Sequence, residues 1–166
     1  MLIIAKSMRD LRIGELIEVY AQSNLEKTSD WPNLPKGFAL QLAEQDFRQY
    51  LQEVFFRTRG AICGIWQVNG TYVSALRLEP YRDGLLLEGL ETAPDFRRKG
   101  YAAMLIRAVQ QFLREQGDVK LYSHVEKRNV ASLNTHISCD FKIISDCAVY
   151  INGNMDYRCC TLLYEA

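Results

Sequence analysis

The stretch TAPDFRRKGYAAM, residues 92–104, joins a run typical of a β-strand to a run typical of a helix, with Arg97, Arg98 and Lys99 directly before Gly100. The first backbone N–H groups of a helix have no partner within the helix and carry a partial positive charge, which favours a bound phosphate. Gly100 removes a Cβ that would obstruct a bulky anion, and the three cations add charged donors. The turn therefore predicts an oligophosphate site, with a solvated basic face at a helix start as the alternative.

Two well-known phosphate-binding patterns are absent from this turn. The phosphate loop of NTPases ends in Gly-Lys followed by Ser or Thr, whereas here Lys99-Gly100 precedes Tyr101, and Pro94 stands where the first glycine would be. The dinucleotide pattern GxGxxG is missing as well. A P-loop nucleotide site and a Rossmann-type dinucleotide site are both excluded.

Strands and helices alternate on both sides of the turn. Upstream, the apolar periodicity predicts a strand at 2–6, a helix at 8–22 and a helical region at 38–57 interrupted near Asp46. Prolines and a glycine predict a loop at 29–37. Asn69-Gly70 predicts the turn of a hairpin formed by strands at 61–68 and 71–80. From residue 84 onward it predicts a strand at 84–92, a helix at 101–117, a strand at 119–125, a short helix at 129–138, and a strand pair, 142–151 and 156–164, around Asn152-Gly153. The sum is one α/β domain over residues 1–166, with a mixed sheet of about seven strands and about four helices.

The composition is that of an ordinary soluble protein. Twenty Lys and Arg balance twenty Asp and Glu, so there is no overall positive field to attract nucleic acid, and we expect no nucleic-acid partner. No run approaches the roughly 18 apolar residues of a membrane span, and the five cysteines form no CxxC pair. The two histidines show no metal-ligand spacing. We therefore expect a cytoplasmic protein, a monomer or homodimer, without metal or membrane partner.

The turn closely resembles the acyl-coenzyme A signature of the GNAT superfamily of N-acetyltransferases, V-x-P-x-x-R/Q-x-x-G-x-G/A. Pro94, Arg97, Gly100 and Ala102 match this pattern, and Thr92 replaces the usual valine. The resemblance implies the GNAT fold, a mixed and mostly antiparallel sheet that is splayed between its fourth and fifth strands.

A second block, HVEKRNVASLNTHISCDF at residues 124–141, resembles the later family pattern N-x-x-A/S-x-x-x-Y-x-x-x-G-F. Its members in register are Asn129, Ser132 and Phe141. Two positions depart, because His136 stands where the family has tyrosine and Asp140 where it has glycine.

The resemblance implies that acetyl-coenzyme A is the acyl donor. Its pyrophosphate would lie on the backbone amides of the turn, which are those of Arg98, Lys99, Gly100, Tyr101 and Ala102, next to the matched Arg97. Its pantetheine arm would pair with the backbone of Leu90, Glu91 and Thr92. Asn129 resembles the asparagine that contacts this arm, in the block that also contains Ser132, and a plain helix N-cap is the alternative for Asn129.

Acetyl transfer needs a neutral amine, a base for its proton, a donor for the oxyanion and an acid for the thiolate. The resemblance implies a backbone N–H near Leu90 as the oxyanion donor. Glu88 stands at even spacing from Leu90 and Thr92, which predicts a shared strand face and makes Glu88 the candidate base. Binding of a cationic substrate is the alternative for Glu88, and Glu91, expected on the other side, is a weaker candidate.

His136 is the candidate acid. Family members use tyrosine here to protonate the thiolate, and an imidazolium with a pKa of about 6.5 can do the same. Ser132 and His136 are four residues apart and share one helical face. A plain helix-surface residue is the alternative for His136, His124 is expected to be structural, and the other candidate acids are Tyr122, Tyr150 and Tyr157.

The two motifs together predict an N-acetyltransferase that moves an acetyl group directly to a primary amine of a small molecule or peptide in a ternary complex. A coenzyme A-binding sensor that has lost transfer is the alternative, motivated by the missing tyrosine. The acceptor cleft is expected between the first two helices and the last two strands, with Trp31, Phe38 and Tyr50 as apolar wall.

Overall fold

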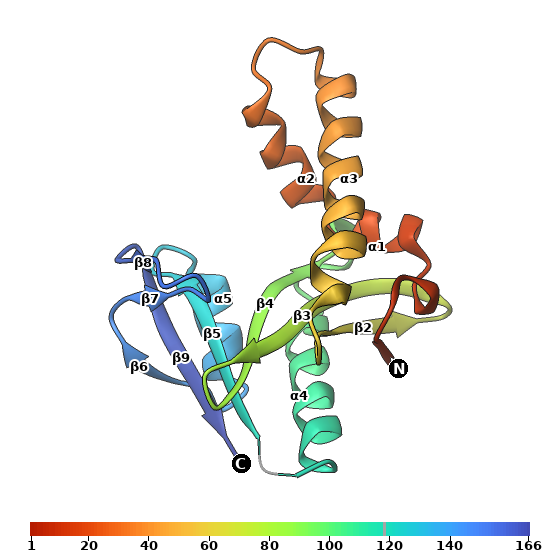
Figure 1. Ribbon diagram of the computed structural model, residues 1–166. Coiled ribbons are helices and arrows are strands. Elements are labelled where there is room, and N and C mark those ends of the chain that lie inside the picture. Colours follow the sequence, from red (N-terminus) through yellow and green to blue (C-terminus); the bar gives the residue numbers. More distant parts are fainter. Residues whose placement is uncertain (118) are drawn as a thin grey trace.

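The fold is organised around a mixed sheet in the order β1-β2-β3-β4-β5-β9-β6, seen in the computed structural model, which describes residues 1–117 and 119–166 (Figure 1). Its strands are β1 (Leu2–Ala5), β2 (Ile62–Val68), β3 (Thr71–Tyr81), β4 (Gly84–Thr92), β5 (Lys120–Glu126), β6 (Lys142–Ser145) and β9 (Cys159–Glu165). All neighbouring pairs are antiparallel except β4 and β5, which are parallel. The predicted mixed, mostly antiparallel sheet is confirmed.

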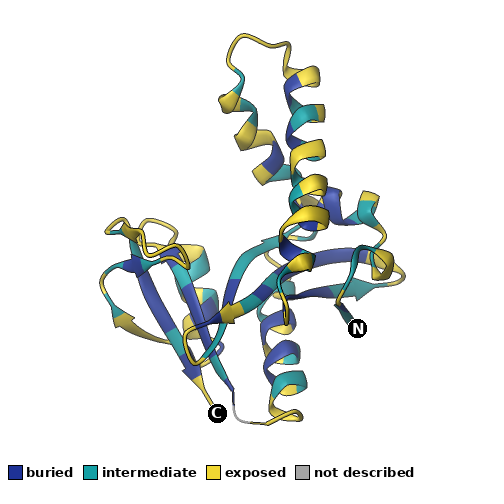
Figure 2. Ribbon diagram, in the orientation of Figure 1, coloured by how far each residue is buried: buried dark blue, intermediate teal, exposed yellow. Residues whose placement is uncertain are grey.

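Helices cover both faces of this sheet and bury a core on each (Figures 1 and 2). They are α1 (Ile13–Val19), α2 (Ala21–Lys27), α3 (Lys36–Glu53), α4 (Tyr101–Arg114) and α5 (Val130–Ile137). On one face, Leu105 and Val109 of α4 pack with Leu76 of β3, because the apolar side chains of this helix lie along one side of it. On the other face, Leu16 of α1 and Leu51 of α3 form a second core.

The tight turn between β2 and β3 follows directly from its two residues. Asn69 and Gly70 have φ angles of 48° and 85°, and Val68 pairs with Thr71. These positive φ angles are those that a two-residue hairpin turn requires, and Asn-Gly adopts them readily. The predicted hairpin is confirmed.

The single helix predicted at 8–22 is wrong. The chain instead forms a 3-10 turn, Met8–Asp10, followed by α1 and α2, which are separated at Tyr20. Asp10 accepts hydrogen bonds from the Lys6 amide and the Ser7 hydroxyl, which holds the first turn apart from α1. Tyr20 is buried, and its hydroxyl donates to the Gly89 carbonyl of β4, so the chain bends where this side chain is anchored.

The interruption predicted near Asp46 is also wrong, because α3 is continuous from Lys36 to Glu53 and ends at Val54. The first half of α3 lies along α2, and together they form an arm that extends from the sheet (Figure 1). The second half packs on the sheet through Leu51. The apolar pattern shifts because the two halves of α3 face different partners.

The predicted strand pair at 142–151 and 156–164 splits into two ladders. β6 pairs with β9 in the main sheet, whereas β7 (Ala148–Val149) pairs with β8 (Met155–Asp156) in a separate short ladder. A bend separates β6 from β7, where the Cys147 amide donates to the Ser145 hydroxyl. The turn around Asn152-Gly153 closes the short ladder, and β6 and β9 pair antiparallel further from it, so the predicted strand pair is confirmed but is interrupted between Ser145 and Ala148.

The strands β4 and β5 separate soon after they meet. Only Leu85–Leu87 of β4 pairs with Leu121–Ser123 of β5, and beyond these residues the two strands diverge (Figure 1). The predicted splay is confirmed, and it opens the edge of β4 just before the basic turn. None of the helices in the described ranges is long and apolar enough to cross a membrane.

Candidate active site

The turn between β4 and α4 presents a row of free backbone amides. A short 3-10 turn, Pro94–Phe96, leads into Arg98 and Gly100, whose φ angles are 57° and 80°, and α4 begins at Tyr101. In the described part of the chain, the amides of residues 98–103 donate to no protein acceptor. A Cβ added at Gly100 would meet no atom within 4 Å, so the space above this glycine is open. Free donors beside open space fit a pyrophosphate group.

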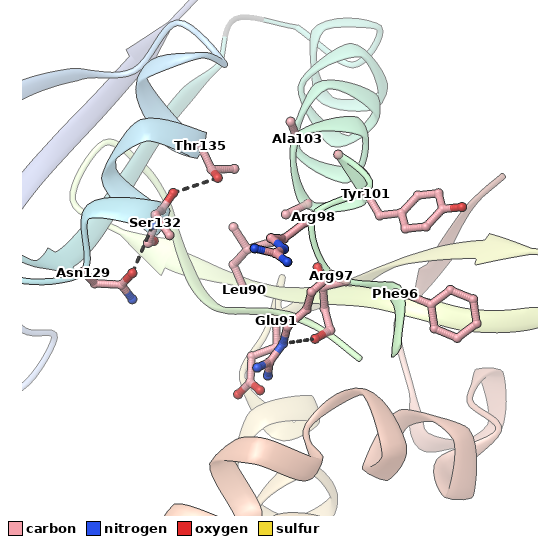
Figure 3. Close-up of a pocket in the computed structure, with 14 residues that line it drawn as sticks. Leu90, Glu91, Phe96, Arg97, Arg98, Tyr101, Ala103, Asn129, Ser132 and Thr135 are labelled. Atoms are coloured by element: carbon pink, nitrogen blue, oxygen red, sulfur yellow. Dashed lines mark hydrogen bonds between the residues drawn. The ribbon is translucent and has the colours of Figure 1, made fainter. Parts of the chain in front are cut away.

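A pocket of about 560 Å³ lies against this turn, between α4 and α5 (Figure 3). The predicted cofactor-binding residues that line it are Leu90, Glu91, Thr92, Arg97, Arg98, Gly100, Tyr101, Ala102, Asn129 and Ser132. Lys99 is the predicted residue that lies outside the lining, because its ammonium group bonds the Asp95 carbonyl. Residues from both sequence motifs therefore meet at one pocket.

Asn129 caps α5, which is one of the two roles that the sequence left open. Its side-chain oxygen accepts a hydrogen bond from the Ser132 amide at 3.0 Å and caps α5, and both residues line the pocket. The capping bond leaves the side-chain N–H groups of Asn129 free for a ligand, so an N-cap and a contact to the pantetheine arm are compatible.

A β-bulge in β4 changes which side chains share a face. Ala75 of β3 pairs with Glu91 and Arg77 pairs with Glu88, so Gly89 and Leu90 oppose a single residue, and Gly89 has a φ angle of 56°. Glu88 and Glu91 therefore both face α1–α3, whereas Leu90 packs against the core on the α4 side. The predicted shared face of Glu88, Leu90 and Thr92 is wrong, because the extra residue reverses the alternation.

Two further pockets meet the first one at this bulge. The second, about 350 Å³, lies in the splay between β4 and β5, and the third, about 270 Å³, lies between α2, α3 and the sheet. Leu90 borders the first two, Gly89 borders the last two, and Glu91 borders all three. The bulge is therefore where a ligand on the basic turn and a ligand under the arm would meet.

The two carboxylates at the bulge have different surroundings. Glu88 accepts hydrogen bonds from Arg77 Nε at 3.2 Å and from the Tyr50 hydroxyl at 3.4 Å. Glu91 accepts a hydrogen bond from the Ser23 hydroxyl, yet burial raises the pKa of its carboxyl above the usual value. The surroundings of Glu91 therefore make its carboxylate a better proton acceptor than an ordinary one.

His136 is buried rather than on the helix surface, with 1% of its surface exposed. Its Nδ1 lies 2.8 Å from the Ser132 carbonyl and therefore carries the proton, and its Nε2 lies 3.1 Å from the Ser123 hydroxyl of β5. Burial lowers the pKa of the imidazole, although the bond to the carbonyl opposes this effect. The ring lines the second pocket as a neutral group, so an acid role requires it to take up a proton during the reaction.

The comparisons with known proteins agree with this geometry. The acetyltransferase (GNAT) family model matches residues 8–141. This chain belongs to the GNAT family. No curated protein matches it in sequence.

Solved structures show how completely the GNAT fold extends over the chain. PaiA N-acetyltransferase of Thermoplasma acidophilum, solved with coenzyme A, is 13% identical with a TM-score of 0.68, covering 100% of this chain and 99% of its own. The ribosomal-protein-alanine N-acetyltransferase of Brucella melitensis is 18% identical with a TM-score of 0.63. The match covers 100% of this chain and 99% of the Brucella chain. The ribosomal-protein-S18-alanine N-acetyltransferase of Escherichia coli is 15% identical with a TM-score of 0.62. The match covers 99% of this chain and 94% of the Escherichia coli chain. At these identities the likeness shows the fold.

The tyrosines predicted as alternative acids of this GNAT protein lie away from the three pockets. The Tyr122 hydroxyl donates to Asp83, and the Tyr150 hydroxyl donates to Asp156 at 3.4 Å. Tyr157 is largely exposed. His124, expected to be structural, packs between the rings of Tyr81 and Tyr150, and its Nδ1 lies 3.1 Å from the Thr161 hydroxyl. It also lines the second pocket, and its buried Nε2 has no partner in the described chain.

Of the three side chains predicted as an apolar wall of the acceptor cleft, one lines a pocket at the bulge. Tyr50 lines the third pocket, but Trp31 and Phe38 line none of the three. Phe38 is 53% exposed, because it lies in the first turn of α3, within the arm. Much of the arm is exposed (Figure 2). Tyr20 and Phe47, which the sequence alone did not single out, line the third pocket together with Tyr50.

No cluster of three or more His, Cys, Asp or Glu side chains suited to a metal ion occurs within residues 1–117 and 119–166.

Proposed function

We propose that the protein is an N-acetyltransferase that transfers an acetyl group from acetyl-coenzyme A to a primary amine. The observation that carries this proposal is the convergence of three pockets on the β4 bulge, next to the free amides of the turn before α4. A donor held on the turn and an acceptor held under the arm would place the thioester and the amine side by side. Direct transfer in a ternary complex then needs no covalent enzyme intermediate.

The basic turn would hold the coenzyme A pyrophosphate through the backbone. The amides of Arg98, Gly100 and Ala102 supply donors, and the helix N-terminus supplies partial positive charge. Arg97 supports the turn, because its Nε donates to the Thr92 carbonyl at 3.1 Å. Among the residues that the structure describes, the edge of β4 beyond Leu87 has no strand partner on the β5 side, so it would pair with the pantetheine arm.

In the transfer step the acetyl group moves from the sulfur of coenzyme A to the amine nitrogen. The amine nitrogen attacks the thioester carbonyl, the C–N bond forms, the C–S bond breaks, and the thiolate leaves. We assign the amine proton to Glu91, which borders all three pockets, rather than to Glu88, which is held by Arg77 and Tyr50. The Leu90 amide as oxyanion donor and His136 as the source of the thiolate proton stay predictions.

Thiol release from acetyl-coenzyme A with a panel of primary amines tests the proposal. We expect amine-dependent release and an N-acetylated product in the mass spectrum. Tight coenzyme A binding with no release by any amine would instead favour a sensor that has lost transfer.

The acid role of His136 has its own test. Replacing the ring by a phenol, His136→Tyr, restores the residue of the family pattern, whereas His136→Ala removes the ring. If His136 protonates the thiolate, kcat falls in His136→Ala and is retained in His136→Tyr. Equal kcat values for His136→Ala and the unmodified protein would remove this role.

A further inference from the structure

The third pocket contains a guanidinium group among aromatic rings. The Arg77 Cζ lies 5.6 Å, 5.8 Å and 5.4 Å from the ring centroids of Tyr20, Phe47 and Tyr50. The side chain of Arg77 is 15% exposed, so it is largely desolvated in this cage. A cation in such surroundings interacts strongly with any anion that reaches it.

The hydrogen-bonding capacity of Arg77 is only partly used. Its Nε donates to Glu88 at 3.2 Å, and within the described residues neither Nη is hydrogen-bonded to a protein acceptor. The guanidinium packs directly on β4, because a Cβ at Gly89 would lie 2.8 Å from Cζ and Nη2. Arg77 lines the third pocket, so these fixed donors are available to a ligand there.

Asn24 of α2 supplies a second unused donor in the same pocket. The residue is 4% exposed, and its Nδ2 has no partner among the described residues. A buried amide without a partner is costly, about 1–3 kcal/mol, unless a ligand satisfies it. Asn24 lines the third pocket together with Arg77, so two residues with unused donors border one small volume.

The pocket carries both signs of charge. Glu91 lies at the side that meets the other pockets, and Lys27, paired with Asp46 at 3.3 Å, lies at the rim. Donors on one side and a carboxylate on the side toward the thioester site are complementary to a molecule that carries an anion next to an amine.

We propose that the acceptor is a free amino acid, with its carboxylate bound by Arg77 and Asn24 and its amine directed toward Glu91. This inference rests on the proposed N-acetyltransferase function and names its substrate class. The volume of about 270 Å³ corresponds to ~9 water-sized groups at roughly 30 Å³ each. An amino acid of about this number of non-hydrogen atoms fits, with an apolar side chain against Phe47 and Tyr50.

A substrate series on the unmodified protein tests the carboxylate without any mutation. The probes are the free amino acids, and for each one its carboxamide and the amine that lacks the carboxyl group. We expect at least one amino acid to exceed both of its analogues in kcat/KM by about 10- to 100-fold, which is the value of one or two charged hydrogen bonds. The amine of a carboxamide is less basic, so intrinsic reactivity alone would favour the carboxamide over the amino acid.

A charge swap at Asn24 tests the site itself. Asn24→Asp keeps the shape of the side chain and opposes a carboxylate, so KM for the preferred amino acid should rise at least tenfold while KM for its decarboxylated amine stays or falls. Asn33→Asp is the matched control, because Asn33 is exposed on the same arm and lines none of the described pockets. Coenzyme A affinity, measured by calorimetry, reports whether each variant is folded.

The results that would overturn the amino-acid site differ from those that would overturn the proposed acetyltransferase function. If amines without a carboxylate react as well as the amino acids, or if Asn24→Asp affects both acceptors equally, the amino-acid site is overturned and the acetyltransferase stands. If no amine at all stimulates thiol release, both are overturned.

Discussion

Substitution of Gly100 by alanine separates coenzyme A binding from stability. Gly100 has a φ angle of 80°, a backbone conformation that costs an alanine about 1–2 kcal/mol. The new Cβ meets no protein atom within 4 Å, so no packing cost is added. For a domain of this size, the loss corresponds to a fall in Tm of about 2–8 °C. The methyl group projects into the space above the free amides, so we expect coenzyme A to bind at least about tenfold more weakly, which is about 1.4 kcal/mol.

Gly70→Ala is the matched control for this experiment. Gly70 has a φ angle of 85° and also has nothing within 4 Å of an added Cβ, but it lies in the β2–β3 turn. The two variants should lose similar stability in thermal unfolding, and only Gly100→Ala should lose affinity for coenzyme A in calorimetry. Equal affinities in the two variants would refute a ligand lying against the amides of Tyr101 and Ala102.

Three further predictions concern the β4 bulge and His136. Gly89→Ala places a Cβ 2.8 Å from the Arg77 guanidinium at a φ of 56°, so urea unfolding should show a loss of about 2–5 kcal/mol with coenzyme A affinity per folded molecule retained. Glu91→Gln should lower kcat by about 100-fold or more and Glu88→Gln by less, and the reverse order would return the base role to Glu88. The folded-state pKa of His136 lies below the unfolded value of about 6.5, so the unfolded state binds more protons and stability falls as pH drops below about 6.5. The Tm difference between pH 7.5 and 5.5 should therefore shrink in His136→Asn, and an unchanged difference would contradict the buried neutral ring.

Local signals in the sequence explain why the hairpin and the basic turn could be predicted. Asn69-Gly70 selects its turn through the φ angles of two adjacent residues, and the motif around Gly100 places a glycine at the start of a helix with a strong apolar stripe. The N-cap at Asn129, the alternative that the sequence offers for this residue, is likewise a local feature, because its side chain bonds an amide only three residues away. Each of these features depends on neighbours in the chain rather than on distant packing.

The features that could not be predicted depend on contacts between distant segments. At the bulge the Arg77 guanidinium of β3 leaves no room for a Cβ on Gly89, and the extra residue moves Glu88 and Glu91 to one face against the alternation of a regular strand. The division between α1 and α2 follows from the anchoring of Tyr20 to Gly89. The unpartnered amide of Asn24 becomes visible only once α2 is folded over the sheet.

Acetyl transfer to an amine is the central claim, and one steady-state measurement tests it most directly. The purified protein is mixed with acetyl-coenzyme A and each amine, thiol release is followed, and the product is identified by mass spectrometry. We predict saturable release that requires both substrates and yields one equivalent of N-acetylated amine per thiol. Release that is independent of every amine, or that yields acetate in place of an N-acetyl product, would contradict the claim.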